Sequence, residues 1–105
     1  MAVLKELKKI GKEMSNSGVI ISGEEGKQIR IYNLILSCQN DTDIQIHFKQ
    51  SPNEDDYVAG GWFTAKGGLV EQYAPEHYVA GGKGDPLYCT MTGGPVRIYV
   101  KYDKE

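Results

Sequence analysis

The segment closest to a nucleotide-binding motif is Gly23 to Lys27, which reads GEEGK. A phosphate-binding loop requires a glycine, four residues, and then Gly-Lys followed by Ser or Thr, because backbone amides and the hydroxyl hold phosphate and Mg²⁺. Here Ile21 stands where the first glycine is required, and Gln28 where the hydroxyl is required. The two glutamates would also repel a phosphate. The segment therefore predicts a plain turn.

Metal-binding spacing is absent from the rest of the sequence. His47 and His77 are far apart, and neither belongs to a Cys-x-x-Cys or His-x-x-x-His arrangement. The carboxylates between Asn53 and Asp56 offer oxygens to Ca²⁺, but without the glycine and the alternating ligands of a calcium loop. We expect His47 to face outward from a strand, the acidic segment to be a solvated loop, and no metal or cofactor to be bound.

The two cysteines, Cys38 and Cys89, fall on the expected inward faces of their strands. A buried cysteine behaves as a small hydrophobic residue, whereas a reactive thiolate needs a nearby cation or helix N-terminus. The first fourteen residues carry charges throughout and lack the apolar core of a secretory signal, which favours reduced thiols. A disulfide between the two cysteines stays open if their strands pair.

No catalytic constellation is evident. The fourteen Asp and Glu residues lie mostly in expected loops and at the tail, and nothing selects two that would flank a cleft. No Ser/His/Asp arrangement stands out either. We expect a protein that is not an enzyme.

Aromatic residues form the more informative set. Trp and Tyr side chains stack on sugars or anchor protein interfaces, and those not needed in the core would form a contact surface. Trp62 and Phe63 are neighbours, so one of them faces the core if the segment is a strand. The candidate aromatic contact surface comprises Tyr57, Trp62, Tyr73 and Tyr78.

Length and charge limit the classes of partner. The chain has 105 residues, which is the size of one domain. Its formal net charge of −2 argues against broad electrostatic attraction to nucleic acid or to an anionic membrane. No apolar run approaches the roughly 20 residues that span a bilayer. We therefore expect neither nucleic acid nor a membrane as a partner.

The pattern after residue 18 is one of strands and turns. Asp43 to Gln50 alternates cleanly, with Ile44, Ile46 and Phe48 inward. Further short strands follow at 57–65, 69–73, 87–91 and 96–102, with turns between them and no intervening helices. This pattern predicts an all-β protein, an antiparallel, jelly-roll-like β-sandwich of about 7–8 short strands.

The longest expected strand, Lys27 to Cys38, changes phase. Ile29 and Ile31 share one face, but Leu34, Leu36 and Cys38 share the other. Two explanations stay open: a bulge near Tyr32 and Asn33 that re-aims the chain, or a central strand that is covered on both sides.

The first fourteen residues predict an amphipathic helix, because Val3, Leu7, Ile10 and Met14 are spaced four, three and four residues apart. A helix this short is marginal alone and must dock on its own domain, a sister subunit or a partner. This apolar stripe is the candidate partner-binding surface. We therefore expect an N-terminal arm and hinge at 1–17 and a β-sandwich at 18–105.

The order of the strand motifs is similar to that of small β-sandwich proteins in the virions of tailed phages and prophages. The resemblance spans roughly residues 19–102. It rests on Gly26 to Ser37, Ile44 to Lys49, Ala59 to Trp62, Gly67 to Val70, Gly84 to Tyr88 and Val96 to Val100.

This resemblance implies a non-enzymatic virion component, such as a capsid decoration (cement) protein or a head or tail fibre module. It also implies contact with the major capsid protein or another virion protein, a homo-oligomer (trimer or dimer), and assembly in the host cytoplasm. The alternative is a carbohydrate- or receptor-binding module that uses Trp62 and nearby tyrosines.

Overall fold

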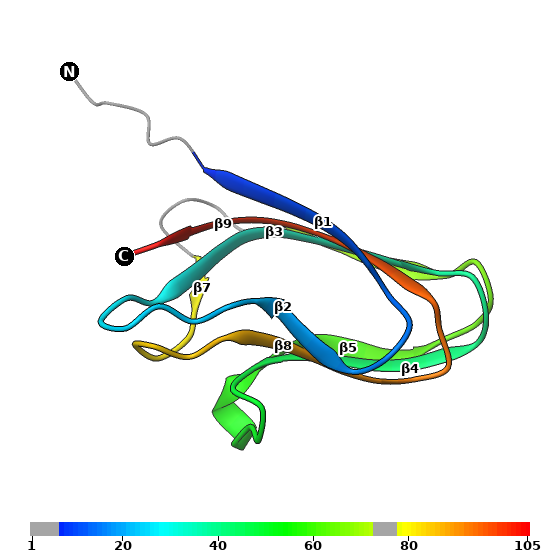
Figure 1. The fold of residues 1–105 in the computed structure, drawn as a ribbon. Helices are drawn as coiled ribbons and strands as arrows, with labels where there is room; N and C mark the ends of the chain where they lie inside the picture. The colour runs from blue at the N-terminus through cyan, green and yellow to red at the C-terminus, as the bar shows by residue number, and fades with distance from the viewer. Residues whose placement is uncertain (1–6, 73–77) are drawn as a thin grey trace.

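Nine strands and one short 3₁₀ helix make up residues 7–72 and 78–105, the part of the chain that the computed structural model describes (Figure 1). The elements are β1 (Lys8–Met14), β2 (Gly18–Ile21), β3 (Ile29–Cys38), β4 (Thr42–Phe48), η1 (Glu54–Asp56), β5 (Tyr57–Phe63), β6 (Gly68–Gln72), β7 (Val79–Ala80), β8 (Leu87–Thr92) and β9 (Val96–Lys104).

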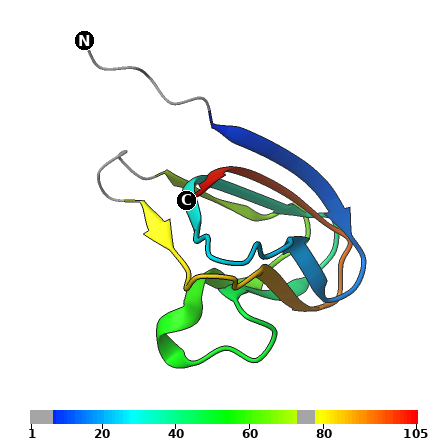
Figure 2. The ribbon, with the colours of Figure 1, turned by 60° about the vertical axis from the view of Figure 1, so that its left-hand side comes forward.

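The strands form two antiparallel sheets. Sheet A has the order β1-β9-β3-β6, and β7 also pairs with β3; sheet B has the order β2-β8-β4-β5. Figures 1 and 2 show the sheets lying one over the other, with η1 projecting beyond sheet B. The prediction of an all-β protein with two antiparallel sheets is confirmed.

The core lies between the sheets and consists of the inward-facing residues of the strands. The predicted inward set on β4 is confirmed, because Ile44, Ile46 and Phe48 are at most 2% exposed. Completely enclosed neighbours from the other strands include Ile31, Leu34, Leu87, Cys89 and Val100. Successive side chains of a strand point to opposite faces, so each strand contributes one row of apolar residues to the core.

The phase change in β3 is a β-bulge, which confirms one of the two explanations. The pairing of β3 with β9 shifts between Ile31 and Asn33, so that Tyr32 is the extra residue. An extra residue reverses the alternation, so Ile31 before the bulge and Leu34 after it both reach the core. β3 is also central, between β9 and β6.

The predicted N-terminal helix is wrong for residues 8–14, which form the edge strand β1. Seven residues of β1 pair with β9, from Lys8 opposite Tyr102 to Met14 opposite Val96. A spacing of four residues, as between Ile10 and Met14, satisfies a period of two as well as a helical one. Gly11 weakens a helix, whereas the open edge of β9 supplies a hydrogen-bonding partner for a strand. Val3 lies outside the described residues.

The connection expected as a hinge carries the chain from one sheet to the other. β1 ends at Met14 in sheet A, and β2 begins at Gly18 in sheet B. Ile10 and Met14 pack against the core, and Met14 is 9% exposed. The Ser17 hydroxyl accepts a hydrogen bond from the Met91 amide at 2.9 Å and so attaches the crossover to β8.

Two loops have the expected character. The predicted turn at Gly23 to Lys27 is confirmed: the Lys27 amide donates to the Glu24 carbonyl at 3.0 Å, and Gly26 has a φ of 77°. The acidic loop contains η1, and the Asn53 amide donates to the Asp56 carboxylate at 2.7 Å.

Tight packing against the core predicts an asymmetry between two glycines. A Cβ on Gly81 would lie 2.5 Å from the ring of buried Phe48, so Gly81→Ala should lower the free energy of unfolding by about 1–3 kcal/mol. The control Gly11→Ala places its Cβ 4.0 Å from Tyr99 and should change stability by less than about 0.5 kcal/mol. Urea denaturation measures both, and equal effects would contradict this packing.

Candidate functional site

Among the described residues, the most exposed aromatic side chain lies on the outer face of sheet B. Trp62 is 81% exposed and lies opposite Asp43, on the edge strand β5. Tyr57, at the other end of β5, is 51% exposed and lies opposite His47. Residues opposite each other in a sheet share a face, and Ile44 and Ile46 mark the inner one. The two predicted contact residues Tyr57 and Trp62 are therefore on the same outer face.

A row of side chains crosses this face from edge to edge. Val19 lies opposite Tyr88, Tyr88 opposite His47, and His47 opposite Tyr57. The His47 ring centroid is 5.5 Å from that of Tyr57 and 5.6 Å from that of Tyr88. Tyr88, His47 and Tyr57 thus form a band of three adjacent rings on the outer face of sheet B.

His47 lies on the outer face, as predicted, yet its side chain is shielded from solvent. It is 1% exposed because the two tyrosine rings cover it. Its Nδ1 is 2.8 Å from the Lys49 carbonyl, to which it donates, and its Nε2 is 2.8 Å from the Thr90 hydroxyl. Both ring nitrogens are satisfied within the protein, which is a structural arrangement.

Between the ends of β5, the outer face has no side chain at Gly60. A Cβ on Gly60 would overlap the Ile44 carbonyl and would lie 2.5 Å from the Gln45 side-chain oxygen, so glycine allows Gln45 to lie across the strand. Asp43 lies directly opposite Trp62, and Gln45 and Thr92 lie on the same face of the sheet. The outer face thus carries one large exposed ring at its edge, together with carboxylate, amide and hydroxyl groups.

Tyr78 belongs to the other sheet. It precedes β7, is 38% exposed, and its ring lies under the Arg30 guanidinium at 4.9 Å. Its centroid is 5.7 Å from that of Tyr32. Tyr73 lies outside the described residues. The structure therefore separates Tyr78 from the surface that contains Tyr57 and Trp62.

The sequence analysis missed the ion-pair cluster beside Tyr78. Arg30 donates to both carboxylate oxygens of Asp103 at 2.7 Å, and the Tyr32 hydroxyl donates to the same carboxylate at 3.1 Å. Glu105 adds a contact of 3.2 Å to Arg30. Arg30 and Asp103 are opposite each other in the β3–β9 pair. The sequence alone does not show this pairing, because it depends on the register shift at the bulge.

The surroundings of this cluster keep each group in its present charge state. Hydrogen bonding to Asp103 raises the pKa of the Arg30 guanidinium above its ordinary value. Burial, followed by the hydrogen bond to Asp103, raises the pKa of Tyr32. Asp103 is 3% exposed, so its carboxylate is buried with a bidentate cation. The cluster fastens the start of β3 to the end of β9.

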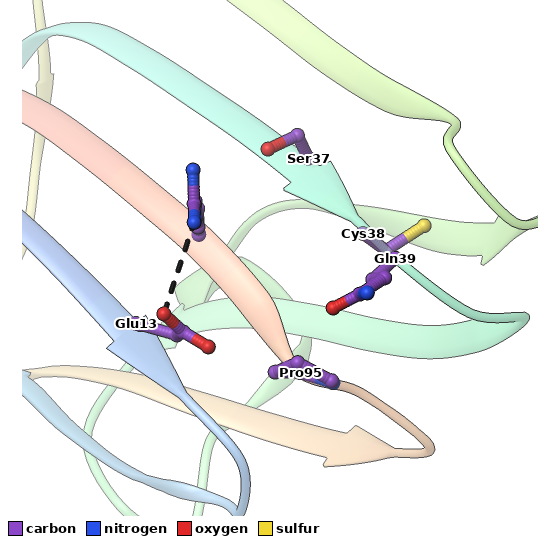
Figure 3. Close-up of a pocket in the computed structure, with 6 residues that line it drawn as sticks. Glu13, Ser37, Cys38, Gln39 and Pro95 are labelled. Atoms are coloured by element: carbon purple, nitrogen blue, oxygen red, sulfur yellow. Dashed lines mark ion pairs between the residues drawn. The ribbon is translucent and has the colours of Figure 1, made fainter.

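A shallow hollow lies on the outer face of sheet A, where β1 and β3 end and β9 begins. It has a volume of about 290 Å³ and is lined by Glu13, Ser37, Cys38, Gln39, Pro95 and Arg97. Glu13 forms an ion pair with Arg97, with 3.9 Å between the charged groups, and a dashed line from Glu13 marks an ion pair in Figure 3. Both are more than half exposed, so this pair contributes little to stability.

The two cysteines are buried and free, with no disulfide between them. Burial raises the pKa of the Cys89 thiol to about 11. The Cys38 thiol donates to the Thr64 carbonyl at 3.3 Å. The predicted inward orientation of both side chains is confirmed.

Within the described ranges, no group of three or more His, Cys, Asp and Glu side chains is placed to hold a metal ion. His77 lies outside these ranges. No helix in the described part of the chain has the length and apolar character required to cross a bilayer.

Comparisons with protein families, with curated proteins and with solved structures found no match. The resemblance to virion proteins therefore stays a prediction from the sequence.

The Arg30–Asp103 pair generates a prediction on stability. Asp103→Asn removes the negative charge from a buried bidentate contact and should lower the free energy of unfolding by roughly 1.5–3 kcal/mol. The control Glu105→Gln removes the more exposed partner and should cost less than about 1 kcal/mol. Urea denaturation at neutral pH compares them, and an equal cost would contradict the central role of Asp103.

Cys89 generates a prediction on pH. The pKa of the Cys89 thiol is about 11 in the folded protein, compared with an ordinary value of 9.0. The contribution of the neutral thiol to the free energy of unfolding should therefore be fully present below pH 9 and be lost as the pH rises through 11. The raised pKa of Tyr32 acts in the same direction. Urea denaturation at several pH values should show a weaker fall in Cys89→Ala than in Leu87→Ala, which also empties a buried site on β8. Identical slopes in the two variants would refute it.

Proposed function

We propose that the chain is a non-enzymatic structural protein of a phage virion, a capsid decoration (cement) protein that binds the shell through the Trp62 end of sheet B. The observation that carries this proposal is the exposure of Trp62, at 81%, on a sheet edge. A partner that covers a side chain of this size removes a large apolar area from water, which stabilises the complex.

Binding by such a surface depends on a large anchor with polar groups on the same face. Trp is among the residues that contribute most at protein interfaces, and truncation of a central one commonly costs 2 kcal/mol or more. Asp43 lies opposite Trp62, and Gln45 and Thr92 add hydrogen-bonding groups on the same face. A decoration protein repeats one modest contact around the shell, and multivalent attachment converts it into stable binding. The partner would be the major capsid protein or another virion protein.

The finer fold that we propose is a jelly roll. Four nested pairs support this assignment: β1 with β9, β2 with β8, β3 with β6, and β4 with β5. A long hairpin of four strand pairs that wraps into two sheets gives this nesting. Jelly rolls occur in viral capsid proteins and in lectins, so the fold is compatible with both candidate functions and decides neither.

The second candidate is a carbohydrate-binding module on the same face. The specific observation in its favour is that one exposed ring shares a face with a carboxylate, an amide and a hydroxyl group, which suits a sugar with its apolar face on Trp62. A receptor glycan or a free oligosaccharide has this chemistry. The two candidates share Trp62 and differ in the partner.

Shell binding tests the proposal directly. Purified protein is mixed with shells of the phage or prophage that encodes it, and the shells are sedimented. The wild type should pellet with the shells, and Trp62→Ala should weaken binding at least roughly tenfold, because the anchor is lost. Val19→Ala is a matched control, since Val19 is an exposed apolar residue at the opposite edge of sheet B.

Wild-type protein that stays in the supernatant would contradict the proposal. A shift in tryptophan emission on titration with oligosaccharides, without shell binding, would establish the carbohydrate candidate instead.

A further inference from the structure

Two lysines lie opposite each other on the outer face of sheet A. Lys9 on β1 lies directly opposite Lys101 on β9, and their parity places both on the side away from Ile10 and Val100, which face the core. Like charges directly opposite each other in a sheet are destabilising. Neither lysine has an ion pair within the described residues, so the positive charge is available to an acidic partner.

Apolar side chains lie next to this pair. The adjacent row across sheet A is Gly11, Tyr99, Ile35 and Val70, each opposite the next. Val70 is 67% exposed and Ile35 is 36% exposed. A hollow of about 440 Å³ lies over β1, β9 and β3 along this row. The surface thus combines two lysines with an apolar strip, and we call it the basic face.

The same chain carries a complementary surface on its other side. In η1, Glu54 and Asp55 are exposed and take no ion pair within the described residues, whereas Asp56 pairs with Lys49 at 3.6 Å. Tyr57 follows directly and is 51% exposed, so the acidic loop also has an apolar neighbour. Figures 1 and 2 both show η1 projecting on the side of sheet B, away from β1 and β9.

We propose that the basic face binds a second copy of this chain, with Glu54 and Asp55 of one copy against Lys9 and Lys101 of the next. The attraction relieves the Lys9–Lys101 repulsion and covers Val70 and Ile35. Each copy has the two surfaces on opposite sides, so the contact is heterologous and joins the copies head to tail. The inference does not depend on the virion role, because Trp62 is not part of it.

Charge reversal tests this proposal through the mass of the protein in solution. Sedimentation at increasing concentration and about 0.05 M salt should show an oligomer that dissociates in high salt, because exposed charges are screened. K9E/K101E and E54K/D55K should each be monomeric, since each has two surfaces of the same sign. An equimolar mixture of the two variants should form oligomers again, because every contact in it joins opposite charges.

The control is K66E/K83E, which changes the net charge equally at exposed lysines in two turns. It should keep the wild-type oligomer, and thermal unfolding verifies that all variants fold. Wild type that is monomeric at every concentration, or an oligomer that survives in K9E/K101E, would overturn the proposal. Shell sedimentation of Trp62→Ala is a separate readout, so failure of this contact and failure of the proposed function are distinguishable.

Discussion

The pairing of β3 with β9 is the constraint on which the remaining structure depends. β3 crosses the centre of sheet A, and the bulge at Tyr32 shifts its register with β9 between Ile31 and Asn33. Without the extra residue, one half of β3 would direct its apolar side chains away from the core. The bulge also places Tyr32 within hydrogen-bond distance of Asp103, whose carboxylate holds Arg30. Packing and the ion pair therefore support the same register.

Alternation with period two was sufficient to predict much of the fold. The inward set of β4, the two buried cysteines and the phase change in β3 all follow from the spacing of apolar residues. The N-terminal strand did not follow, because the spacing of Ile10 and Met14 is compatible with both a helix and a strand. Only the unpaired edge of β9, which is a tertiary feature, decides between them.

The candidate surfaces were less predictable for a related reason. Trp62 and Tyr57 were expected at a contact surface, but their common face depends on pairing with Asp43 and His47, which precede them by 19 and 10 residues in the chain. The burial of His47 depends on rings from two other strands. Similarly, the contact between Arg30 and Asp103 joins distant segments. A sequence shows which face a side chain occupies more readily than which neighbours it meets.

The account places function on the exterior of the sandwich, centred on Trp62. Side-chain footprinting by hydroxyl radicals, with the protein free and then bound to shells, tests this claim most directly. The account predicts that Trp62 becomes strongly protected on binding, because it is the most exposed large hydrophobic side chain among the described residues. Oxidation of Trp62 at the same rate in both states, with protection confined to other surfaces, would contradict it.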